Sequence, residues 1–195
     1  MPFPAPVDEL GLAIRVRSTL IVSSLQSLRR RGREDSYLQH LPPEHHGIVR
    51  SLIAGHWLPM ALAEAHYDAC EALAFDRQEI LAIGREVGDR IEGSFLATMV
   101  RMAGNVGATP WTALAQVGRL YDRLFEGGGV SVLRRGPKDA RVLFAGMPLA
   151  RVPYFRSAIA GVLEVGLQLF CTRAYAQIAP QPGPQTAVVF ELAWA

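Results

Sequence analysis

The chain has 195 residues, of which half are hydrophobic and 19% are charged, and its formal net charge is +2 at pH 7. This length suits one domain with a core that needs neither disulfides nor metal, and the composition excludes an intrinsically disordered chain. The best candidate for a membrane span, Ala158 to Cys171, is short and carries Glu164 and Gln168 in its middle. Two cysteines and the absence of a signal-peptide pattern predict a cytoplasmic protein with free thiols.

The N-terminal part of the chain is predicted to be mostly helical. Residues 1–8 contain three prolines and are expected to form a disordered tail before a single domain over 9–195. Alternation over 12–17 predicts a short strand, and Ser18 or Thr19 is expected to cap a helix that ends at Gly32. A connector over 37–41, a modest helix over 43–54, an apolar corner over 57–59 and a strong helix over 60–74 follow.

The longest periodic run, over 78–106, predicts one long helix. Gly84 and Gly88 lie one turn apart in this run, and each costs about 1 kcal/mol of helix propensity. Because two glycines in this spacing remove the side chains from one helix face, another element is expected to pack closely there. A further helix is predicted to begin with proline at Pro110 and to end at the three glycines 127–129.

After these glycines the hydrophobic period changes from helical to alternating. Strands are predicted over 130–134 and 140–145, a helix from Pro153, and a second strand pair over 172–179 and 186–194. In the last strand, one face carries Val188, Phe190, Leu192 and Trp194. The predicted fold class is α+β, with a helical N-terminal two thirds followed by hairpin, helix and hairpin, which form an antiparallel sheet packed on helices.

Motifs of enzymes are missing from the sequence, which has no G-x-S-x-G, no phosphate-binding loop, no H-E-x-x-H and no EF-hand loop, so no catalytic role is expected. His66 and Cys70 lie four apart on one helix face, but a pair is half a zinc site. Two basic clusters, 29–33 and 134–138, lack interleaved aromatic residues, which argues against nucleic-acid binding.

Three stretches together resemble an uncharacterised paralogous family that is expanded in myxobacteria. They are Trp57-Leu-Pro-Met60, Ile83-Gly-Arg-Glu-Val-Gly88, and the block from Tyr154-Phe-Arg to Phe190-Glu-Leu-Ala-Trp194. The order of elements is in turn similar to the superfamily of four-vinyl reductase domains, TRAPP trafficking subunits and haem nitric-oxide-binding domains. This resemblance implies an α+β fold that encloses an apolar ligand or dimerises through helices.

The resemblance also bears on cofactors. The haem branch of the superfamily carries a Tyr-x-Ser-x-Arg motif with a proximal histidine, and this sequence has no such motif. The four-vinyl reductase branch often carries cysteines near the terminal strands, where this chain has only Cys171. No cofactor is therefore expected, neither haem nor zinc.

The sequence leads to two functional hypotheses. The first is a non-enzymatic domain that binds or senses an apolar small molecule, since half of the chain is hydrophobic. The alternative is a homodimeric interaction or scaffold module without a ligand, because exposed apolar faces mark interfaces. Neither a nucleic-acid partner nor a membrane span is expected. The residues predicted to line the pocket or interface are Trp57, His66, Cys70, Gly84, Gly88, Phe95, Tyr154, Phe170 and Cys171.

Overall fold

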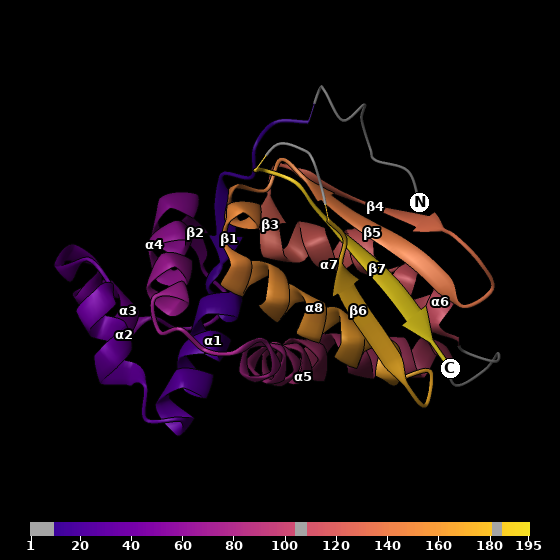
Figure 1. The fold of residues 1–195 in the computed structure, drawn as a ribbon, viewed down its shortest axis with the longest axis horizontal. Coiled ribbons are helices and arrows are strands. Elements are labelled where there is room, and N and C mark those ends of the chain that lie inside the picture. Colours follow the sequence, from indigo (N-terminus) through magenta and orange to yellow (C-terminus); the bar gives the residue numbers. More distant parts are fainter. Residues whose placement is uncertain (1–9, 104–108, 181–184) are drawn as a thin grey trace.

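The computed structural model describes residues 10–103, 109–180 and 185–195, and for 92–103 it describes the backbone alone. The fold is α+β, as the sequence predicts (Figure 1). The predicted tail over 1–8 lies outside the described residues. The elements up to the long helix are β1 (Arg15–Arg17), α1 (Ser18–Arg30), α2 (Glu34–His40), the 3-10 turn η2 (Pro43–His45), α3 (His46–Ser51), β2 (Trp57–Pro59), α4 (Met60–Glu71) and α5 (Arg77–Ala103).

The rest of the chain alternates between short helices and strands. Its elements are α6 (Pro110–Leu114), α7 (Val117–Leu124), β3 (Phe125–Glu126), β4 (Gly129–Arg134), β5 (Asp139–Ala145), the 3-10 turn η3 (Pro148–Arg151), α8 (Pro153–Gln168), β6 (Ala174–Ile178) and β7 (Val188–Trp194). The predicted order of hairpin, helix and hairpin after residue 129 is confirmed.

The strands form two antiparallel sheets. A small sheet has the order β2-β1-β3, and a larger one has the order β4-β5-β7-β6. The predicted inner face of the last strand is confirmed, since Val188, Phe190, Leu192 and Trp194 are all buried. Because side chains alternate between the faces of a strand, this pattern fixes the register of β7 between its two neighbours.

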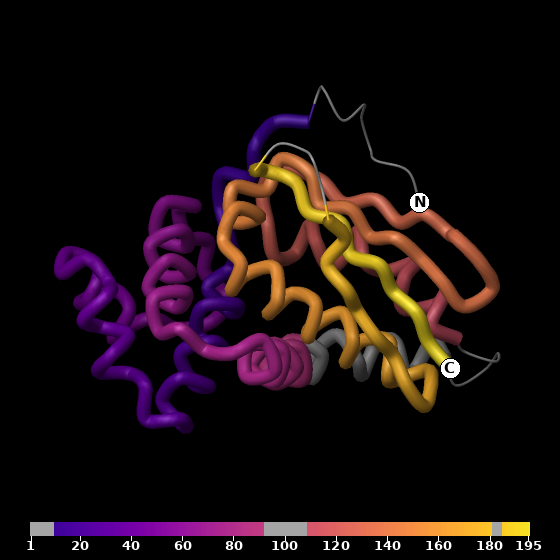
Figure 2. Tube along the Cα trace, viewed as in Figure 1, coloured from indigo at the N-terminus to yellow at the C-terminus, as the bar shows by residue number. Residues whose placement is uncertain are grey.

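Helix α8 is the centre of the core. It lies between the larger sheet and α5, while α1 to α4 gather at one end of the molecule (Figure 1; Figure 2). The buried Glu164 of α8 joins these layers: its Oε2 accepts a hydrogen bond from Arg85 of α5 at 3.0 Å, and its Oε1 accepts one from the backbone N–H of Ala176 in β6 at 3.1 Å.

Glycines permit the close crossing of α5 and α8, which confirms the prediction from Gly84 and Gly88. A Cβ on Gly84 would lie 2.8 Å from the carbonyl carbon of Ala158, and one on Gly88 would lie 3.3 Å from the Cα of Val162. Gly161 contributes from the α8 side, where a Cβ would lie 3.1 Å from the Cα of Gly84. The backbones therefore touch where both helices lack side chains.

Some sequence predictions for the N-terminal part were wrong in detail. The expected connector over 37–41 is largely helical, because α2 reaches His40. The expected cap on α1 is also absent: Ser18 is its first residue, and the Ser18 hydroxyl instead donates to the Ile53 carbonyl at 2.8 Å and accepts from the His56 N–H at 2.9 Å. Ser18 therefore fastens the loop before β2 to the start of α1.

Candidate functional site

The structure divides the predicted site residues among separate places. Gly84 and Gly88 lie at the helix crossing, His66, Cys70 and Tyr154 meet in the core, Trp57 lies in β2, and Phe170 and Cys171 follow the end of α8. Phe95 belongs to 92–103 and lies outside the described side chains. Because α8 has 16 residues and a rise of about 1.5 Å per residue, it keeps Phe170 well away from Tyr154 in its first turn.

A buried group of polar side chains, here called the core cluster, lies where α1, α2, α4 and α8 meet. Its centre is the pair that the sequence predicted, since Cys70 Sγ lies 3.6 Å from His66 Nε2, and neither residue is accessible to solvent. The other members are Ser24, Tyr37, Tyr67 and Tyr154. Sequence reasoning missed Ser24, Tyr37 and Tyr67, because no local pattern distinguishes a buried polar residue from an exposed one.

Both ring nitrogens of His66 have partners. The hydroxyl of Tyr37 lies 2.8 Å from Nδ1, and the thiol of Cys70 faces Nε2. Burial lowers the pKa of His66 to about 3, so that its imidazole is neutral at physiological pH. Among the described residues, His, Cys, Asp and Glu side chains form no group of three that could hold a metal ion.

Two hydroxyl groups of the core cluster have unused hydrogen-bonding capacity. Ser24 Oγ and Tyr154 Oη lie close to the Cys70 thiol, yet among the described residues neither makes a hydrogen bond of normal geometry. Burial raises the pKa of the Cys70 thiol and of the Tyr154 phenol, so both stay protonated. An unsatisfied buried polar atom destabilises the folded state by about 1–3 kcal/mol. Ser24 Oγ and Tyr154 Oη are two such atoms beside the same thiol, inside an otherwise apolar core.

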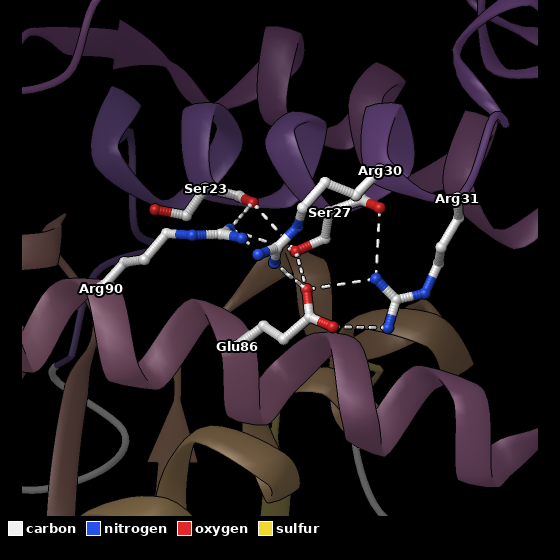
Figure 3. Close-up of polar contacts among 6 residues, drawn as sticks. All are labelled: Ser23, Ser27, Arg30, Arg31, Glu86 and Arg90. Atoms are coloured by element: carbon white, nitrogen blue, oxygen red, sulfur yellow. Dashed lines mark hydrogen bonds and ion pairs between the residues drawn. The ribbon is translucent and has the colours of Figure 1, made fainter.

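A second polar group, here called the Glu86 hub, joins α1 to α5 (Figure 3). Glu86 accepts hydrogen bonds from Arg31 at 2.7 Å, from the Ser27 hydroxyl at 2.7 Å, and from Arg30. Arg90 lies one turn further along α5 and donates to the Ser27 hydroxyl at 3.1 Å and to the carbonyl of Ser23. The sequence indicated the pair of Glu86 and Arg90, but the partners from α1 are a product of the fold.

The electrostatics of the hub favour the charged form of Glu86. Partial burial by itself raises the pKa of this carboxyl group, but the hydrogen bonds from Arg31 and Ser27 and the charges of Arg31 and Arg30 lower it to about 2. One carboxylate thus faces three guanidinium groups. Arginines of the cluster at the end of α1 therefore connect α1 to α5 through Glu86, in addition to forming a solvated basic patch.

A cleft of about 320 Å³ opens at the small sheet, between α1, the loop before β2, α5 and α7. Trp57, one of the predicted residues, lies next to it and carries the guanidinium of Arg17 over its ring at 4.1 Å from the centroid. These two residues are direct partners across β1 and β2. No local sequence pattern indicates Arg17, since its pairing with Trp57 joins segments that lie 40 positions apart.

No protein-family model and no curated protein sequence matches this chain. Its fold, however, is similar to solved H-NOX domains. The Fe(II) unliganded H-NOX protein from K. algicida has a TM-score of 0.62 at 11% identity, over 92% of this chain and 96% of its own. An oxygen-binding H-NOX domain related to soluble guanylate cyclases has a TM-score of 0.58 at 8% identity, over 90% and 92% of the two chains. The likeness shows a haem-NO-binding-like fold.

These comparisons correct the prediction about cofactors. The sequence predicts no cofactor, because the Tyr-x-Ser-x-Arg motif of the haem branch is missing. That prediction is contradicted, because the structural neighbours include H-NOX domains solved in work on haem distortion and haem redox potential. The physical reason is that 8–13% identity can preserve a fold while replacing its motifs. The missing motif therefore does not exclude haem.

The residues of this chain do not offer haem a preformed histidine ligand. All five histidines are described, and His66 is the buried one among them. An iron atom could bind either of its nitrogens only after Tyr37 or Cys70 had moved away. Burial also raises the pKa of the Cys70 thiol, which disfavours the thiolate that a metal would bind.

Proposed function

We propose that this chain is a sensor domain that binds an apolar small molecule. The observation that carries the proposal is the likeness to H-NOX domains over nine tenths of the chain and of its neighbours. Ligand pockets are concave and largely apolar, with a few polar groups that fix orientation. The cleft beside Arg17 fits that description.

The test is a search for a ligand in the purified protein. Native mass spectrometry should reveal an apolar adduct, and titration with haem should produce a Soret band at one equivalent if the ligand is haem. A His66→Ala variant separates binding through that imidazole from binding elsewhere in the fold. An adduct-free protein that binds neither haem nor any apolar compound, with an unchanged melting temperature, would refute the proposal.

A homodimeric interaction module is the second candidate. The outer face of the larger sheet exposes apolar side chains, with Leu133 at 56% and Tyr175 at 53% of their full accessibility. Light scattering at micromolar concentration tests this, because a strict monomer would contradict it. The absence of a catalytic role and the cytoplasmic location stay predictions. None of the helices within the described ranges combines the length and hydropathy needed to cross a membrane.

A further inference from the structure

The cleft at the small sheet is lined by apolar side chains and by the side chain of Arg17. Ile91 of α5 and Leu120 and Leu124 of α7 supply the apolar lining. Among the residues whose side chains the structure describes, the charged ones that line it are Arg17 and Arg123. An apolar surface beside the positive charge of Arg17 is complementary to a molecule with an apolar body and a negatively charged head.

Backbone carbonyls and an aromatic ring hold Arg17 in place. Its Nη1 donates to the Gly55 carbonyl at 2.8 Å, its Nε donates to the Arg123 carbonyl at 3.3 Å, and its guanidinium lies over the ring of Trp57. In the described part of the chain Arg17 forms no ion pair, whereas Arg15 on the same strand pairs with Glu126 at 3.2 Å. The side chain is therefore fixed, and no described carboxylate neutralises its charge.

The remaining amino group of Arg17, Nη2, can donate hydrogen bonds to an anion. Nη2 makes no hydrogen bond to any described residue, while Nε and Nη1 are both engaged. A guanidinium whose orientation is already set loses little entropy when it binds a carboxylate. Two carbonyls and an aromatic ring thus hold the guanidinium of Arg17 in one place on the wall of the cleft.

We propose that this cleft binds an amphiphilic carboxylate, with its carboxylate on Arg17 and its apolar body on Ile91, Leu120 and Leu124. The inference rests on the proposed function and specifies the class of its ligand. Two shapes of molecule share this chemistry, a linear fatty acid and a tetrapyrrole with carboxylate side chains. Arg17 discriminates both of them from a neutral apolar molecule, because the neutral molecule offers no negative charge to its guanidinium.

Isothermal titration with dodecanoate, with protoporphyrin IX and with the neutral dodecan-1-ol tests the proposal. At least one of the two carboxylates should bind at least tenfold more tightly than the alcohol, and which one binds identifies the shape of the ligand. Arg17→Gln should weaken that binding about tenfold or more. Arg17→Lys keeps the charge and should bind better than the Gln variant. Arg15→Gln is the matched control, since it removes the same charge from the same strand but not from the cleft.

The outcomes separate this inference from the proposed function. Equal affinity of the Arg17→Gln and Arg15→Gln variants, equal binding of the carboxylate and the alcohol, or no binding of either carboxylate would overturn the inference. A native adduct in the purified protein would still support a ligand-binding domain in each of these cases. Circular dichroism of all three variants ensures that a loss of affinity is not a loss of folding.

Discussion

The crossing of α5 and α8 allows the most direct test of the structure. Replacing Gly84 by alanine adds one methyl group, which would lie 2.8 Å from the carbonyl carbon of Ala158 and closer still to its oxygen. These are backbone atoms, so no side chain can rotate away. The helices would have to separate by on the order of 1 Å to restore ordinary contact distances.

The magnitude follows from two opposing effects. Overpacking a rigid contact costs about 3 kcal/mol at the upper end of its usual range, whereas alanine in place of glycine gains about 1 kcal/mol of helix propensity. The net loss is about 2 kcal/mol, which for a domain of this size lowers Tm by about 4–8 °C. Urea and thermal unfolding, followed by far-UV circular dichroism, measure both quantities.

Gly47→Ala is the matched control for this experiment. Gly47 lies in α3, its φ is not in the left-handed region, and a Cβ there would have no atom within 4 Å. The control should stabilise the protein by about 0.5–1 kcal/mol. If Gly84→Ala were as stabilising as Gly47→Ala, the backbones of α5 and α8 would not touch at this point, and the reasoning would be refuted.

Three further predictions concern the hub and the core cluster. Glu86→Gln should lower the free energy of unfolding by about 2 kcal/mol at pH 7. Because the folded pKa of Glu86 is lowered to about 2, the stability that its carboxylate contributes is present above pH 4.5 and is lost toward pH 2. Urea titrations should therefore show the difference between wild type and variant shrinking over that range, and a constant difference would contradict the hub. Because the folded pKa of His66 is about 3, its imidazole is protonated between pH 6.5 and about 3 only in the unfolded state, and the native state loses up to about 1.4 kcal/mol of stability per pH unit. His66→Gln should therefore flatten the dependence of stability on pH between 6.5 and 4.5, and an unchanged slope would argue against a buried neutral imidazole. A maleimide should label Cys171 and not the buried Cys70 in the native protein; equal labelling rates by mass spectrometry would contradict that burial.

Local sequence patterns predicted much of the fold. The change from helical to alternating period after residue 129 predicted the hairpin, helix and hairpin, and the alternation of Val188, Phe190, Leu192 and Trp194 predicted the inner face of the last strand. Gly84 and Gly88 predicted a close neighbour. These predictions succeeded because hydrophobic periodicity and the absence of side chains at glycine depend only on residues within one segment of the chain.

The candidate site could be predicted only in part. His66 and Cys70 were predicted as a pair, since a spacing of four places side chains on one helix face. Their surroundings were not predicted, because Tyr37 and Ser24 reach the core cluster from α2 and α1. The prediction that no haem is bound depends on a missing sequence motif, whereas the similarity to H-NOX domains depends on the path of the backbone.

The sequence by itself determined the secondary-structure class, the apolar faces and the glycine crossing, since each depends on the spacing of residues within one segment. The tertiary structure alone decided where charge meets apolar surface. Arg17 reaches Trp57 only because β1 pairs with β2, and Glu86 meets Arg31 only because α1 packs on α5. Interactions between distant segments depend on the packing of whole elements, and for that reason the cleft and the hub became visible only in the folded chain.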